Sequence, residues 1–301
     1  MTEIVSAEPV LNRGLLCSLL EANTNHDNPG LGLDFYRPEQ EFGYPEAYAN
    51  LGRAAFVLGE TDLAQRCVDF LGSDVCWGLP WPWRLYGETE PVPANTGFVT
   101  TTVSCLAFLE QFGLADYSWL VEHAWVYGEH ETAQIRVYNS WAQAACCLAK
   151  ENSGLAKELL KETSEGVWNG LYAYSPDKPF AFEQHQAMVH EGFISNEIDQ
   201  IVELDATWRV FFSNSGLGVR TAGRKEPMWV QHMAWQAYVY ALANQWERSD
   251  LIVEGLLRYY QLPDGRLTIV PGGEPYVRPA AGALCCLALI VELRDAGNTS
   301  D

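Results

Sequence analysis

The chain has 301 residues, of which 48% are hydrophobic and 12% aromatic, enough to build a core in one large domain or two ordinary ones. Its 39 acidic and 19 basic residues give a formal net charge of -20 at pH 7. So acidic a surface repels phosphate backbones and anionic lipids, which argues against nucleic acid and membrane surfaces as partners. No apolar run approaches the roughly 20 residues of a membrane span, and the first residues do not have the pattern of a signal peptide. We therefore expect a cytoplasmic protein without membrane insertion.

Six helical segments rich in small residues recur along the chain, at steps of 41 to 51 residues. Repetition on this scale is typical of architectures built from one repeated unit. The segments are apolar or small on every side, which is typical of helices that are covered all round. We interpret them as inner helices, which span residues 43–60, 92–113, 136–154, 182–197, 226–246 and 275–293.

Helices with one polar face alternate with the inner helices, and their apolar residues recur three and four positions apart. We expect Thr61 or Asp62 to begin the first of them and Ser249-Asp250 to begin the last, because such residues cap helices. These outer helices span residues 62–73, 115–128, 155–166, 197–214 and 249–261. Five outer helices follow five inner ones, so the N-terminal segment 9–23 is the expected partner of the sixth inner helix.

Twelve such helices would form a ring, with the inner set around an axis and the outer set wrapped about it. Joining the first helix to the last leaves no linker to divide the chain, so we predict a single all-α domain over residues 1–301. The loops before inner helices, notably 75–97 and 166–186, are rich in Gly, Pro, Trp and Tyr. In a ring these loops gather at one end, and loops on a rigid scaffold commonly carry function. We expect the functional site at that end.

The alternation of two helix types resembles the (α/α)6 toroid, which six-hairpin glycosidases and lyases share with terpenoid cyclases and protein prenyltransferases. The stretch 258–265 is similar to the Gln…Gly-x-Trp repeat of triterpene cyclases, with Leu267 where the tryptophan falls. The stretches 76–87 and 170–193 look more like toroid proteins of polysaccharide metabolism. In those proteins an aromatic loop precedes an Asp-x-x-His or similar pair, and Glu183 and His185 stand near these positions. The resemblance implies a central cavity that acts on a sugar.

The candidate acid and base, together with a histidine partner, lie at the starts of inner helices. Glu183 and His185 precede the fourth inner helix, and Glu226 has the corresponding place before the fifth. Hydrolysis, elimination or epimerisation of a sugar needs a proton donor and a base, which are usually carboxylates or a His partner. The structural alternative is a carboxylate that stabilises a helix N-terminus beside a hydrogen-bonded histidine.

Aromatic, amide and cationic side chains near the same end are the candidate substrate-binding groups. Indole rings stack on sugars, and amide and phenol groups bind hydroxyls, although burial and helix capping are the structural alternatives. Arg278 could bind a carboxylate or pair with Glu274. The candidate binding residues are Trp81, Trp83, Asn95, Tyr138, Asn139, His232 and Arg278.

Cofactor motifs are missing from the sequence. It has no Gly-x-Gly-x-x-Gly after a strand, no phosphate-binding Gly-x-x-x-x-Gly-Lys and no His-Glu-x-x-His. Its eight cysteines show no Cys-x-x-Cys spacing, and the adjacent pairs 146–147 and 285–286 lie in apolar helices. We therefore expect structural cysteines, no metal and no cofactor.

The favoured function is a carbohydrate-active enzyme, a hydrolase, lyase or epimerase, that works on a small-molecule or oligosaccharide substrate by acid–base chemistry. The alternative is a class II-type terpenoid cyclase, in which a buried acid protonates a polyene, although its Asp-x-Asp-Asp motif is absent. A third possibility is a binding toroid without catalysis. The oligomeric state is not predicted.

Overall fold

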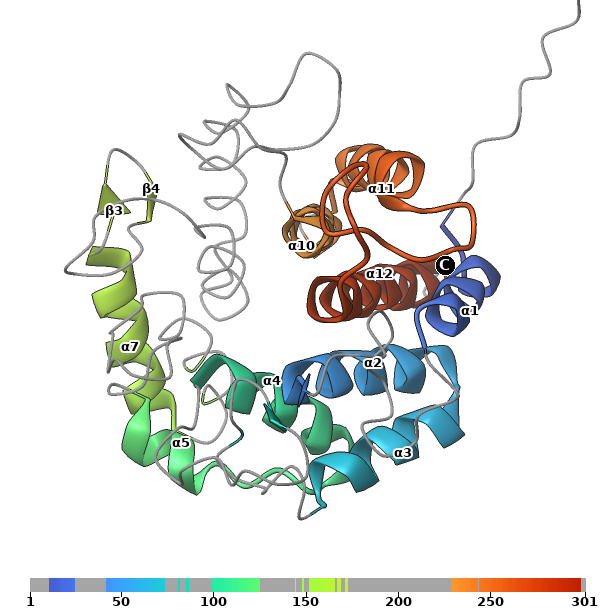
Figure 1. Cartoon of the computed structure of the whole chain (residues 1–301). Helices are drawn as coiled ribbons and strands as arrows, with labels where there is room; N and C mark the ends of the chain where they lie inside the picture. Colours follow the sequence, from blue (N-terminus) through green and yellow to red (C-terminus); the bar gives the residue numbers. More distant parts are fainter. Residues whose placement is uncertain are drawn as a thin grey trace, which may run out of the picture.

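The computed structural model describes residues 11–24, 42–73, 81, 85–86, 99–124, 144, 148, 152–165, 167–168, 171–172, 229–242 and 244–298. The regular elements in these parts of the chain are helices apart from four strands of two residues each, and residues 261–276 form a loop between two helices. Figure 1 shows the helices along a curved path that runs from α11 and α10 through α12 and α2 to α4, α5 and α7. Within the described ranges no helix has both the length and the apolar character needed to cross a bilayer.

Four inner helices are described, and each lies within or overlaps an expected segment. They are α2 (Pro45–Leu58), α4 (Val99–Leu109), α10 (Val230–Leu242) and α12 (Val277–Asn298). α12 packs against both α10 and α2, and α2 packs against α4. The last inner helix of the chain therefore lies beside the first, as a closed ring requires. The expected inner helix 182–197 lies outside the described residues, and only parts of 136–154 are described.

The outer helices pack on the inner ones as the alternation predicts. α3 (Thr61–Leu71) packs on α2, α11 (Trp246–Tyr260) on α10, and α5 (Ser118–His123) on α4. α7 (Ser153–Glu165) coincides with the expected segment 155–166, and segment 197–214 lies outside the described residues. The N-terminal helix α1 (Arg13–Ala22) contacts α12 and α2, so it has the predicted place beside the sixth inner helix.

The expected start of α11 at Ser249-Asp250 is wrong. The helix begins at Trp246, and Ser249 lies buried within it with its backbone N–H bonded to the Gln245 carbonyl at 3.1 Å. The guanidinium of Arg248 donates to the Gln245 side chain at 2.6 Å, which stabilises an earlier first turn without a side-chain cap. The Ser-Asp pair therefore lies inside the helix and does not cap it.

The described residues include two short strand pairs, and one of them joins the loops that precede α2 and α4. β1 (Phe42–Gly43), just before α2, pairs antiparallel with β2 (Leu85–Tyr86), which precedes α4. β3 (Val167–Trp168) pairs with β4 (Leu171–Tyr172) after α7. The loop before α12 reaches α10, where the Val230 N–H donates to the Ile269 carbonyl at 2.9 Å. The described loops before inner helices therefore gather at one end, as expected.

Small residues let the inner helices approach closely. A Cβ added at Gly52 of α2 would lie 2.4 Å from a ring carbon of Phe108 in α4 and 2.8 Å from Cys67 in α3. Every residue of α12 from 279 to 291 is buried. The described cysteines are free thiols, and those at 67, 105, 285 and 286 are buried in this core. The small-residue pattern of the sequence thus reflects helix packing.

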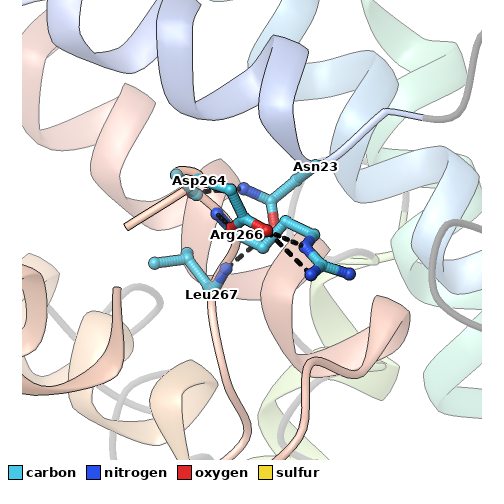
Figure 2. A network of polar contacts seen from close by, with 5 residues as sticks. Asn23, Asp264, Arg266 and Leu267 are labelled. Carbon is cyan, nitrogen blue, oxygen red and sulfur yellow. Dashed lines mark hydrogen bonds and ion pairs between the residues drawn. The ribbon is translucent and has the colours of Figure 1, made fainter. Parts of the chain in front are cut away.

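A buried asparagine joins the N-terminal helix to the loop between α11 and α12 (Figure 2). The Asn23 amide donates to the Leu19 carbonyl at 2.7 Å and to the Gly265 carbonyl at 3.1 Å, and its side-chain oxygen accepts the Leu267 N–H at 3.0 Å. Gly265 has a φ of 89°, which glycine adopts without strain. Figure 2 also shows the neighbouring ion pair of Asp264 and Arg266, whose hydrogen bond lowers the pKa of the Asp264 carboxyl.

We predict that Asn23→Ala lowers the free energy of unfolding by about 2–4 kcal/mol, because it strands a buried backbone N–H and carbonyl without partners. Urea denaturation measures the loss. Arg266→Ala is the control: it breaks an exposed ion pair of the same loop and should cost less than about 1 kcal/mol. Equal losses in the two variants would contradict the role given to Asn23.

We also predict that stability falls in alkaline solution through Cys67. Burial raises the pKa of this thiol from 9.0 to about 12, so the unfolded chain loses its proton first as the pH rises. The contribution is fully present below pH 9 and is lost toward pH 12, at up to about 1.4 kcal/mol per pH unit. Urea midpoints at pH 8 to 10 should therefore fall less steeply in Cys67→Ala. Burial also raises the pKa of the Cys17 thiol, but this thiol is partly exposed, so Cys17→Ala should change the slope less than Cys67→Ala does.

Candidate functional site

The N-terminal ends of α2 and α12 meet at the end of the ring where the loops gather. Tyr44 and Tyr276 stand just before the two helices, with hydroxyls in contact and ring centroids 5.9 Å apart in an edge-on arrangement. Two residues further along each helix, the Nε of Arg278 donates to Oε2 of Glu46 at 2.6 Å. The side chains of Glu46 and Arg278 are 5% and 21% exposed. Two matched polar contacts thus join the first inner helix to the last.

Helix electrostatics explain this ion pair. The N-terminus of a helix carries a partial positive charge, which favours the Glu46 carboxylate in the first turn of α2. The same effect disfavours a cation in the first turn of α12, where Arg278 lies. Because the two helices start side by side, Glu46 supplies the negative charge that Arg278 needs. The pair is a fixed, largely dehydrated feature of this end of the ring.

The start of α10 presents a row of aromatic rings. His232 is only 7% exposed and stacks on Trp229, with centroids 5.8 Å apart and planes within 8°. Trp235 lies on its other side, with centroids 6.1 Å apart. Trp229, which directly precedes the helix, keeps 37% of its surface exposed. An exposed indole held flat by a buried imidazole is a suitable surface for a sugar ring.

Deeper in the ring, side chains of three inner helices approach one another. Burial raises the pKa of the Tyr238 phenol in α10, while the positive charge of Arg53 in α2 acts in the opposite direction. Cys285 and Glu292 of α12 also influence this phenol. These side chains come from α2, α10 and α12, which pack against one another in the order α10, α12, α2.

The described part of the site offers hydrogen bonds and fixed charge. A neutral phenol, a stacked imidazole, an ion pair and buried amides can bind and orient a hydroxylated molecule. Among the described residues no group of three or more His, Cys, Asp or Glu side chains is placed to hold a metal ion.

Three of the predicted binding residues are described. Trp81 is 4% exposed, and its indole N–H donates to the Leu71 carbonyl of α3 at 3.2 Å, which agrees with the alternative of burial against the rim. His232 and Arg278 lie at the inner-helix starts, and the described partner of Arg278 is Glu46. The predicted residues outside the described ranges are Glu183, His185, Glu226, Trp83, Asn95, Tyr138 and Asn139.

The structure adds two residues to the site, Glu46 and Trp229. Both lie at the beginning of an inner helix, the position that already singled out His232 and Arg278. Position in the repeat was therefore the available signal. For Glu46 the missing information was its partner, which lies 232 residues away in sequence.

Models of known protein families and curated protein sequences give no match to this chain. Solved structures do. A glycosidase is similar with 14% identity and a TM-score of 0.61, over 93% of this chain and 97% of that one. The fold is the (α/α)6 toroid.

Further toroid structures agree along nearly the whole chain. A family 88 glycosyl hydrolase from Bacteroides vulgatus is 13% identical with a TM-score of 0.59, over 94% of this chain and 99% of that one. A sugar epimerase from a ruminal bacterium is 12% identical with a TM-score of 0.63, over 91% and 95%. At such identities the likeness establishes the fold alone.

We predict that Arg278→Met lowers the free energy of unfolding by about 3 kcal/mol, because it leaves the buried Glu46 carboxylate without its countercharge. The double variant Glu46→Gln/Arg278→Met should recover much of the loss. A double-mutant cycle from urea denaturation measures the coupling. Additive losses would show that the two side chains do not depend on each other.

Proposed function

We propose that this chain is a carbohydrate-active enzyme, a glycoside hydrolase, lyase or epimerase, that uses acid–base chemistry in the central cavity of the toroid. The observation that carries the proposal is the likeness, over more than nine tenths of the chain, to structures described as a glycosidase, a polysaccharide lyase and a sugar epimerase. One similar glycosidase variant was solved in complex with glucose. The shared chemistry of these proteins is proton transfer at a sugar.

The described end of the ring supports this proposal. Trp229 offers an exposed indole on which a sugar ring can stack, and the buried His232 holds its orientation. The Glu46–Arg278 pair fixes the starts of two inner helices, which gives the cavity a rigid wall. A rigid wall matters because proton transfer needs the donor within hydrogen-bond distance of the reacting oxygen or carbon.

In this proposal Glu183 and Glu226 supply the acid and the base, with His185 as their partner. Both carboxylates belong to the segments that lead into neighbouring inner helices, so the repeat predicts that they lie at the same end as Glu46 and Trp229. A carboxylic acid protonates the leaving oxygen while a carboxylate activates water or removes a proton. Trp83, Asn95, Tyr138 and Asn139 are the proposed contacts to the sugar.

We predict that Glu183→Gln and Glu226→Gln each lower kcat by about 10²–10⁴-fold, the usual contribution of a positioned acid or base. The substrate is first found with wild-type protein on a panel of aryl glycosides, pectin- and glycosaminoglycan-derived oligosaccharides and reducing disaccharides. Product release, ultraviolet absorbance of new double bonds and NMR detect hydrolysis, elimination and epimerisation.

Glu122→Gln is the matched control, because Glu122 is exposed on the outer helix α5. It should retain wild-type kcat. Full activity in both Glu183→Gln and Glu226→Gln would refute the acid–base assignment. Sugar binding without any turnover would favour the non-catalytic toroid.

A further inference from the structure

One amide at the start of α10 has no hydrogen-bond partner in the part of the chain that the structure describes. Gln231 is the second residue of the helix and is 3% exposed, and its Nε2 is buried with no hydrogen-bond partner. An amide that leaves water without a replacement hydrogen bond costs free energy, and native proteins rarely tolerate the loss. The position of this amide therefore requires an explanation.

A glycine on the neighbouring helix holds the amide in place. A Cβ at Gly282 of α12 would lie 2.8 Å from Cγ and Cδ of Gln231 and 2.9 Å from its Nε2. A larger residue at this point would displace the end of the Gln231 side chain. The Gln231 side chain is thus pressed into the seam between α10 and α12 and is not a loose surface group.

Two other buried polar atoms near an inner-helix start have a simpler explanation. The hydroxyls of Thr101 and Thr102 in α4 are also without a partner. A threonine hydroxyl in a helix can rotate toward the carbonyl one turn earlier, so its cost is small. The carboxamide of Gln231 carries two N–H donors against a neighbouring helix and needs an acceptor from outside its own backbone.

The seam lies near the starts of α10 and α12. Gln231 is the second residue of α10. Gly282 lies one turn after Arg278 on α12, and Arg278 pairs with Glu46. The amide is thus placed close to the starts of both helices and next in the chain to the stacked His232.

We propose that Gln231 is a substrate-binding residue whose carboxamide hydrogen-bonds to a hydroxyl of the bound sugar, with Gly282 as the residue that positions it. A hydroxyl both donates and accepts, so it can serve an amide whichever way the amide is turned. The site is incomplete until the ligand supplies this partner. The inference rests on the proposed carbohydrate substrate. It adds one residue, Gln231, that recognises a hydroxyl of this substrate.

The test separates stability from sugar binding with Gln231→Met, which keeps the volume and removes the amide. Differential scanning fluorimetry of the full chain is run without sugar and with glucose, galactose, mannose, N-acetylglucosamine or galacturonate, and titration calorimetry follows for the best of them. Without sugar the variant should melt at the wild-type temperature or a few degrees higher, because an unsatisfied buried amide has been removed. Its Kd for the sugar should rise about tenfold or more.

Gln65→Met is the control, since Gln65 is exposed on the outer helix α3 and its amide donates to the Asp69 carboxylate at 2.8 Å. It should retain the wild-type Kd. Gly282→Ala should weaken sugar binding through displacement of the Gln231 amide. If so, adding Gly282→Ala to Gln231→Met should not weaken binding further.

The outcomes are distinct. A sugar that binds wild type and Gln231→Met equally well, or a variant that melts several degrees lower without sugar, overturns the role of Gln231 and leaves the proposed function standing. If no sugar binds wild-type protein and none is turned over, the proposed function itself fails. A selective rise in Kd with an unchanged melting temperature supports the binding role.

Discussion

Direct packing of the last inner helix on the first is the constraint on which this structure depends. α12 packs between α10 and α2, and its buried run from 279 to 291 is covered by these neighbours and by α1. A helix that is apolar on every side can be stable in water only when it is covered on every side. The chain therefore closes on itself because α12 needs both neighbours.

Polar contacts fix the geometry of this closure at several levels. Asn23 joins α1 to the loop before α12, Tyr44 meets Tyr276, and Glu46 pairs with Arg278. Apolar packing alone would let α12 slide along α2 by a fraction of a turn. Hydrogen bonds between residues 232 and 244 apart in sequence define one register, and the same register places the starts of the inner helices at one end. The scaffold and the candidate site thus depend on the same contacts.

The sequence predicts the helices because periodicity is a local property. Small residues on every side mark inner helices, a single polar face marks outer ones, and together they predicted both the ring and the place of α1. Contacts across the seam are not local. The sequence does not show that Arg278 pairs with Glu46, because that pairing depends on how α12 lies against α2. Ser249 shows an error in a local prediction. Serine is typical of helix caps, but Ser249 lies inside α11 because the helix begins earlier, at the turn around Gln245 and Arg248.

Gln231 is a second residue whose contacts could not be predicted from the sequence. In the sequence, a glutamine in an apolar helix does not indicate its surroundings. The structure shows both its contact with Gly282 and the lack of a described hydrogen-bond partner for its amide nitrogen. Helix starts carry the loops and the unpaired backbone N–H groups of the ring. Which residue at each start faces the axis becomes visible only once the helices are packed.

The common direction of the inner helices also constrains any acid–base mechanism at this end. The described starts of α2, α10 and α12 lie together, and each contributes a partial positive charge. Such a field stabilises carboxylates in their charged form, which suits a base and the ion-paired Glu46. An acid must remain protonated, so it needs burial or a neighbouring carboxylate to oppose the field. The proposed pair, Glu226 and Glu183, can divide these roles only if their surroundings differ, with the acid further from the helix ends or closer to other negative charge.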